Sequence, residues 1–207
     1  MVDTMGTGLP YLEKALKNNY PATNFFLLNF GVGSTNIDDG LARLSQPFNY
    51  QNRSYPPLLQ AEVDAVIIES FAYNPLPLSE ANLAHHRFQL EKMVRQVQSQ
   101  TSAPVLLMAT IAPHHELFGT GPGGVNWEGG AVAEHTQAIH AYLENTINTG
   151  NALGIPVIDV FHPSQDSEGN GQLRLISPHD HIHPSAAGQN FIAQTIAQTL
   201  VSLKLLE

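Results

Sequence analysis

The chain has 207 residues, of which 43% are hydrophobic, a length and composition that predict a single globular domain over residues 1–207. Its 9 Lys and Arg against 18 Asp and Glu give a formal charge of −9, which argues against nucleic acid as a partner because phosphate contacts need clustered cations. The absence of Cys excludes disulfides, thiolate metal sites and cysteine nucleophiles, and no apolar run approaches the roughly 20 residues of a membrane span.

Helices and strands are predicted to alternate along the chain. Taken in order, they are a helix over 9–18, a strand over 25–30, a helix over 37–44, a strand over 63–68, a helix over 79–100, a strand over 104–109, a helix over 131–148, a strand over 155–160 and a helix after Pro184. Residues 45–61 contain three prolines and are expected to form an irregular connection. Because the strands are continuous apolar runs, we expect a parallel sheet between helical layers, the α/β class.

Polar and glycine-bearing segments follow the predicted strands. They are residues 31–36, 70–74, 113–115 and 161–164. The carboxyl ends of parallel strands lie at one edge of a sheet, which is where ligands bind in open α/β folds. The sequence therefore predicts one shared site at this edge.

Asp180 and His183 are candidates for acid–base chemistry within the segment Asp180-His-Ile-His183-Pro184. A carboxylate three residues before a histidine can hold the imidazole tautomer and stabilise the imidazolium, which makes the histidine a general base. The alternative is a polar loop without a catalytic role, in which Asp180 is a capping residue and His183 is solvated. The short pattern alone leaves both interpretations open.

Asn74 and Gly33 also follow predicted strands. The Asn74 amide is a candidate hydrogen-bond donor to an oxyanion, and a glycine at position 33 would let a backbone N–H approach a substrate closely. Each residue has a simpler explanation, namely an Asx turn before Pro75 and a tight strand-to-helix turn.

Taken together, these segments resemble three sequence blocks of the SGNH/GDSL hydrolases. The similar segments are Asn29-Phe-Gly-Val-Gly33, Asn74 after a buried strand, and Asp180-x-x-His183-Pro184. The resemblance implies a flavodoxin-like three-layer α/β/α sandwich and an esterase in which His183 is the base, Asp180 orients it, and Gly33 and Asn74 stabilise the oxyanion. Two departures are that Ala72 replaces the glycine of the third block and that no Asp follows Asn74. The second oxyanion N–H is assigned either to Gly33 or to the position of Ser34.

The nucleophile block of that family, a strand ending in Gly-Asp-Ser, does not occur in this sequence. Residues 1–12 instead resemble the loop and helix that directly follow the serine. We therefore expect the chain to begin just after the nucleophile, to lack the first strand of the sheet, and to be inactive. The sequence assigns no substitute nucleophile, because no serine lies in a Gly-x-Ser-x-Gly elbow.

Two other interpretations remain. His179, His181 and His183 alternate, so in an extended segment they would share one face and form the ligands of a metal-dependent hydrolase. A non-catalytic pseudoenzyme that binds a ligand in the same cleft is the second. Under the esterase interpretation the substrate is a small-molecule or glycan ester, and neither a cofactor nor a metal is expected.

Overall fold

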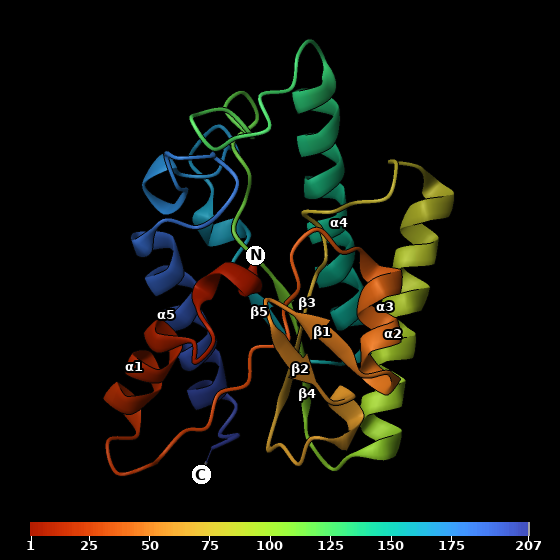
Figure 1. Ribbon diagram of the computed structural model, residues 1–207, viewed down its shortest axis with the longest axis vertical. Helices are drawn as coiled ribbons and strands as arrows, with labels where there is room; N and C mark the ends of the chain where they lie inside the picture. The colour runs from red at the N-terminus through yellow and green to blue at the C-terminus, as the bar shows by residue number, and fades with distance from the viewer. Residues whose placement is uncertain (207) are drawn as a thin grey trace.

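A computed structural model describes residues 1–206, and a three-stranded parallel sheet lies at its centre (Figure 1). The strands are β3 (Val66–Glu69), β4 (Val105–Ala109) and β5 (Val157–Asp159), in the order β3-β4-β5. Val66 lies opposite Val105, and Leu107 lies opposite Val157. All five residues of β4 are buried, as expected for the central strand of a sheet covered on both faces. Three predicted strands and their parallel pairing are confirmed.

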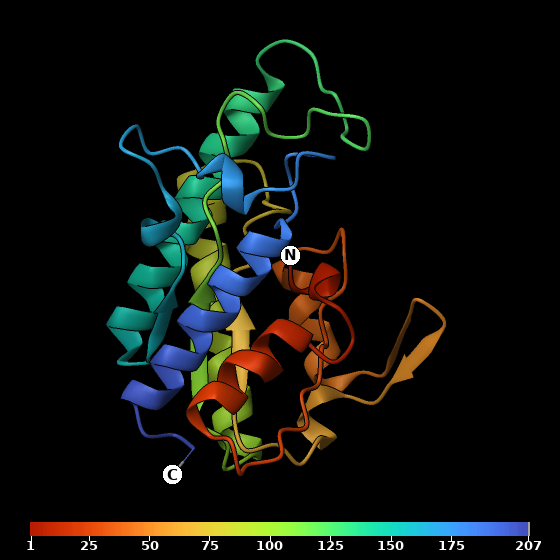
Figure 2. The same cartoon turned by 90° about the vertical axis from the view of Figure 1, so that its left-hand side faces the viewer.

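Helices cover both faces of this sheet (Figures 1 and 2). On one face lie α1 (Pro10–Asn19) and α5 (Ala186–Ser202), and on the other lie α2 (Ile37–Ser45), α3 (Glu80–Gln100) and α4 (Ala131–Leu153). Because side chains alternate along a strand, Leu106 of β4 packs with α1 and α5, whereas Leu107 packs with α2 and α3. The predicted three-layer α/β/α sandwich is therefore confirmed.

The helices begin and end close to the predicted positions. Ser79 caps α3 by accepting a hydrogen bond from the N–H of Asn82 at 3.1 Å, and Ser185 caps α5 by accepting one from the N–H of Gly188 at 3.1 Å. Helix α4 continues past the predicted end at residue 148. It contains Gly150, where a Cβ atom would lie 2.3 Å from the Val157 side chain, so close packing against β5 explains a residue that ordinarily disfavours a helix.

The predicted strand over residues 25–30 is wrong. Residues 25–30 form no strand. Within residues 1–206, β3 pairs only with β4, and no strand pairs with this segment. Phe25 and Leu27 pack against the core, but Phe26 is 88% exposed and Leu28 is 42% exposed. The segment is thus buried on one side only, although its continuous apolar composition predicted burial on both sides.

Residues 45–61 are more ordered than predicted. They contain an antiparallel hairpin of β1 (Phe48–Tyr50) and β2 (Arg53–Tyr55), followed by the 3-10 turn η2 (Leu58–Gln60). The two turn residues have φ values of 49° and 60°, the left-handed geometry typical of a two-residue hairpin loop. The prolines flank the strands rather than interrupting them, and the hairpin projects from the body of the molecule (Figure 2).

Short 3-10 turns complete the chain, namely η1 (Val2–Met5), η3 (His162–Ser164) and η4 (Leu173–Leu175). Within residues 1–206, none of the helices combines the length and the apolar character needed to span a bilayer.

Candidate active site

Asp180 and His183 are in direct contact in the loop before α5. The Nδ1 atom of His183 lies 2.6 Å from Oδ2 of Asp180, while Oδ1 of Asp180 accepts hydrogen bonds from the N–H groups of Ile182 and His183 at 2.9 and 3.0 Å. The N–H of Ser177 donates to the His183 carbonyl at 2.7 Å. Both carboxylate oxygens are therefore engaged, and the ring orientation of His183 is fixed.

The environments of these two side chains differ in the way that a base and its orienting acid require. The side chain of Asp180 is 11% exposed and that of His183 is 39% exposed. Burial raises the pKa of Asp180, but the hydrogen bonds from the His183 ring and from the two backbone N–H groups outweigh it, so the pKa lies below its ordinary value. An ionised Asp180 accepts the proton of Nδ1, which leaves the lone pair of His183 on Nε2.

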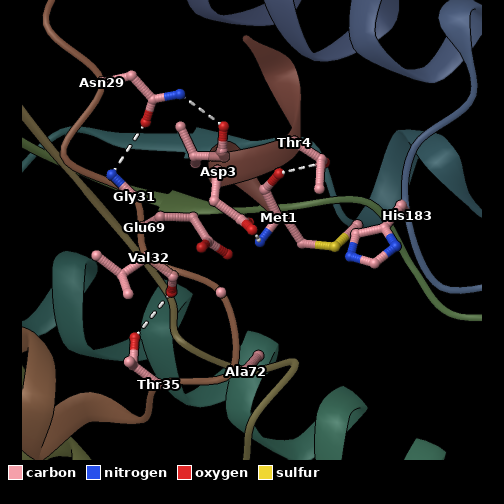
Figure 3. Close-up of polar contacts among 12 residues, drawn as sticks. Met1, Asp3, Thr4, Asn29, Gly31, Val32, Thr35, Glu69, Ala72 and His183 are labelled. Carbon is pink, nitrogen blue, oxygen red and sulfur yellow. Dashed lines mark hydrogen bonds and ion pairs between the residues drawn. The ribbon is translucent and has the colours of Figure 1, made fainter. Parts of the chain in front are cut away.

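Figure 3 shows the His183 ring next to the side chain of Met1, at the edge of the 3-10 turn η1. On the other side of η1, Asn29 fastens the turn by donating to the carbonyls of Val2 and Gly6 at 2.8 and 2.9 Å. Its Oδ1 accepts from the N–H of Gly31 at 2.9 Å. The first residues of the chain therefore lie between His183 and the loop that contains Gly33.

Gly33 lies against η1 and is in contact with the hairpin. A Cβ atom at position 33 would lie 2.7 Å from Oδ2 of Asp3, so only glycine fits without a shift. The N–H of Gly33 donates to the hydroxyl of Tyr50 at 3.2 Å, and that hydroxyl in turn lies 3.3 Å from Asp3 Oδ2. Tyr50 was not anticipated, because it is distant in sequence and belongs to the hairpin that the prolines concealed. Ser34, the alternative donor position, has a φ of 57°.

Asn74 is exposed and follows β3 in the loop opposite the N-terminus of α2. It lines a narrow crevice together with Asn36, Phe71 and Tyr142. Within residues 1–206 the side-chain amide of Asn74 makes no hydrogen bond, so the Asx turn that was the simpler explanation for this residue is absent. Figure 3 shows Ala72, two residues earlier, on the same side of η1 as Thr35.

The three alternating histidines do not converge. His181 Nδ1 lies 2.9 Å from Oγ1 of Thr120, the ring of His179 lies against Gly123, and His183 binds Asp180. In the part of the chain that the structure describes, no cluster of three or more His, Asp or Glu side chains is arranged to hold a metal ion. The geometry thus does not supply the ligand set that the metal-dependent interpretation requires.

The structure contains a second Asp–His pair that was not predicted from the sequence. Asp159 and His162 share the Asp-x-x-His-Pro spacing, and His162 Nδ1 lies 2.7 Å from Asp159 Oδ2. The other ring nitrogen of His162 lies 3.0 Å from Oε1 of Glu144 on α4. The repeated spacing was the available signal, whereas the partner on α4 is visible only in three dimensions.

Comparisons with known proteins agree with this architecture. A family model described as "GDSL-like Lipase/Acylhydrolase family" matches residues 3–191. No curated protein matches the sequence.

Solved structures show the same fold at low sequence identity. A lipase/acylhydrolase from Enterococcus faecalis is 20% identical with a TM-score of 0.64, covering 94% of this chain and 86% of that chain. A GDSL-like lipase from Bacteroides thetaiotaomicron VPI-5482 is 14% identical with a TM-score of 0.64, covering 95% and 84%. An acetyl xylan esterase, AlAXEase, is 14% identical with a TM-score of 0.64, covering 96% and 95%.

Proposed function

Because the chain belongs to the GDSL-like lipase/acylhydrolase family of ester hydrolases, we propose that it cleaves carboxylic esters by serine chemistry, with His183 as general base and Asp180 as its orienting acid. The observation that carries this proposal is the Asp180–His183 pair, in which Nδ1 is bound at 2.6 Å. No partner for Nε2 is found among residues 1–206, so that atom is available to accept a proton.

The reaction proceeds in two balanced halves. A serine Oγ attacks the ester carbonyl while its proton passes to Nε2 of His183, and the imidazolium then gives that proton to the departing alcohol. Water next attacks the acyl-enzyme and gives a proton to the same nitrogen, and the serine recovers it as the carboxylic acid leaves. Asp180 stabilises the imidazolium in both halves.

We propose that the nucleophilic serine lies upstream of Met1. This placement is supported by Figure 3, where Met1 lies next to the His183 ring. Ser70 is a poor substitute because it is fully buried and its hydroxyl donates to Glu69 at 3.1 Å. Ser34 is held in a left-handed conformation on the loop beside Gly33.

The oxyanion is assigned to the N–H of Gly33 and the side-chain amide of Asn74. The free amide of Asn74 supports this assignment, since it has no competing intramolecular partner within residues 1–206. Substrate binding then requires the Tyr50 hydroxyl to release the Gly33 N–H, which it accepts at 3.2 Å. The substrate class is a small-molecule or glycan ester.

The test is expression of the chain extended upstream through a strand and Gly-Asp-Ser. The extended protein should hydrolyse p-nitrophenyl acetate and take up one equivalent of a serine-directed phosphonate, while its Ser→Ala variant should do neither. The 207-residue chain should be inactive. Robust turnover by the 207-residue chain would overturn the proposal. An extended protein that neither hydrolyses p-nitrophenyl acetate nor reacts with the phosphonate would also overturn it, and would favour a ligand-binding role.

A further inference from the structure

We propose that His181 is a positioning residue, which clasps Thr120 of the glycine-rich loop and thereby holds His183 in its reactive orientation. The loop in question is the segment Gly119–Asn126, here called the glycine-rich loop. This inference rests on the proposed role of His183. It assigns a function to a segment that the catalytic machinery does not otherwise use.

The clasp itself is a two-acceptor hydrogen bond. Nδ1 of His181 lies 2.9 Å from Oγ1 and 3.0 Å from the carbonyl oxygen of Thr120. The Thr120 hydroxyl donates its own proton to the carbonyl of Leu117 at 2.6 Å, so it acts as an acceptor toward the imidazole. Nδ1 of His181 must therefore carry the proton, and both Thr120 oxygens accept it.

The backbone of His181 gives the clasp a mechanical role. Its φ is 50°, in the left-handed region that only a few per cent of residues other than glycine adopt, histidine among the more frequent of them. His181 stands between Asp180 and Ile182, and the N–H of Ile182 donates to Asp180 Oδ1 at 2.9 Å. A change in the backbone at residue 181 would therefore move the N–H groups of Ile182 and His183 away from the carboxylate that orients the base.

The glycine-rich loop is built to approach this segment closely. The N–H of Gly123 donates to the carbonyl of His179 at 2.8 Å. A Cβ atom at Gly121 would lie 2.7 Å from that carbonyl oxygen, and one at Gly123 would lie 2.1 Å from His179 Nε2. Glycine at both positions is what allows the approach, so the glycines and the His181 contact form one bracing surface.

Apolar residues flank both sides of this contact. Ile182 packs against the core cluster that contains Phe118, the residue just before the glycine-rich loop. The two segments are thus joined by a backbone hydrogen bond at Gly123 and a side-chain hydrogen bond at Thr120. Of these, only the Thr120–His181 bond is made by a side chain, so it can be removed by substitution.

The experiment follows the tautomer of His183 by NMR of isotope-labelled histidine in the 207-residue chain. In the parent chain the proton should reside on Nδ1. His181→Phe removes the donor but keeps the ring volume, and Thr120→Val removes one acceptor. Both should mix the tautomers of His183, with the larger effect in His181→Phe. Thr199→Val is the matched control, because that hydroxyl also bonds a backbone carbonyl, at 2.9 Å, but on α5.

In the serine-bearing extended protein, His181→Phe should lower kcat about tenfold or more with KM changed less than about twofold, since small misplacements of a catalytic group are costly. An unchanged His183 tautomer in both variants overturns the clasp, even if the melting temperature falls. If the extended protein is inactive but the tautomer responds, the proposed function fails and the positioning role stands.

Discussion

The two Asp-x-x-His-Pro segments of this chain are nearly identical in local geometry and different in surroundings. Their Nδ1–Oδ2 distances are 2.7 Å for His162 and 2.6 Å for His183, and in each segment the histidine N–H donates to Asp Oδ1 at 3.0 Å. The other nitrogen of His162 faces Glu144 at 3.0 Å, whereas the part of the chain that is described holds no partner for Nε2 of His183. The Asp-x-x-His-Pro spacing thus produces the Asp–His contact in both segments. Whether the histidine has a free nitrogen depends on a further side chain, which is Glu144 in one segment and is not found in the other.

Charge separates the two pairs further. The hydrogen bond to Asp159, followed by the contact with Glu144, raises the pKa of His162 against the opposing effect of partial burial. A histidine that holds its proton between two carboxylates is a poor proton acceptor. Because the side chains of His162 and Glu144 are both 47% exposed, this pair is also weakly coupled to stability.

The largest test of the comparison exchanges each histidine for alanine in the serine-bearing protein. His183→Ala should lower kcat by roughly 10³-fold or more, because the general base and the imidazolium are both lost. His162→Ala should leave kcat within about twofold, since its geometry is the same but its base is blocked. Steady-state kinetics measure both values of kcat. Equal losses in the two variants would contradict the assignment of the base to His183 alone.

Removal of the proposed oxyanion donor should have the next largest effect. Asn74→Ala is expected to lower kcat roughly 10²-fold, the usual cost of one oxyanion contact, with a smaller change in KM. Its melting temperature should stay near that of the parent, because the amide makes no hydrogen bond within residues 1–206. A kcat close to the parent value would remove Asn74 from the site.

His86 provides a contrast to both pairs, because it is a buried histidine that is not bonded to a carboxylate. Burial lowers its pKa to about 4, although the hydrogen bond from its Nε2 to the Ser70 carbonyl acts in the opposite direction, and its Nδ1 bonds Asn145. The unfolded chain therefore binds the extra proton first, and stability falls as the pH drops from about 6.5 toward 4, by up to roughly 3 kcal/mol. Denaturant unfolding across this range should show a shallower loss in His86→Gln.

The smallest expected effect belongs to Glu144→Gln. The raised pKa of His162 means that its pairing contributes stability at low pH and loses it as the pH rises through the folded-state pKa. Because these groups are half exposed, the unfolding free energy should change by less than about 1 kcal/mol at neutral pH. A much larger change would mean that the pair holds α4 against the end of β5.

The sequence revealed features that depend on neighbours close in the chain. Asp180 and His183 are three residues apart and their side chains are in contact, while their catalytic roles stay a prediction. The Ser79 cap is also a local signal, and it is confirmed. The strand predicted over residues 25–30 failed because pairing depends on a partner strand, which apolar composition does not reveal. Tyr50 and Glu144 escaped prediction because each reaches its partner, Gly33 or His162, across the fold.

The hairpin has a consequence for how this scaffold can diversify. Its strands pair only with each other, and the rings of Phe48 and Tyr55 stack at 4.7 Å, so its order owes nothing to the register of the central sheet. Yet one of its side chains touches the amide of Gly33. Exchanging the hairpin between related proteins should therefore change the surroundings of Gly33 while the central sheet and its helices stay intact.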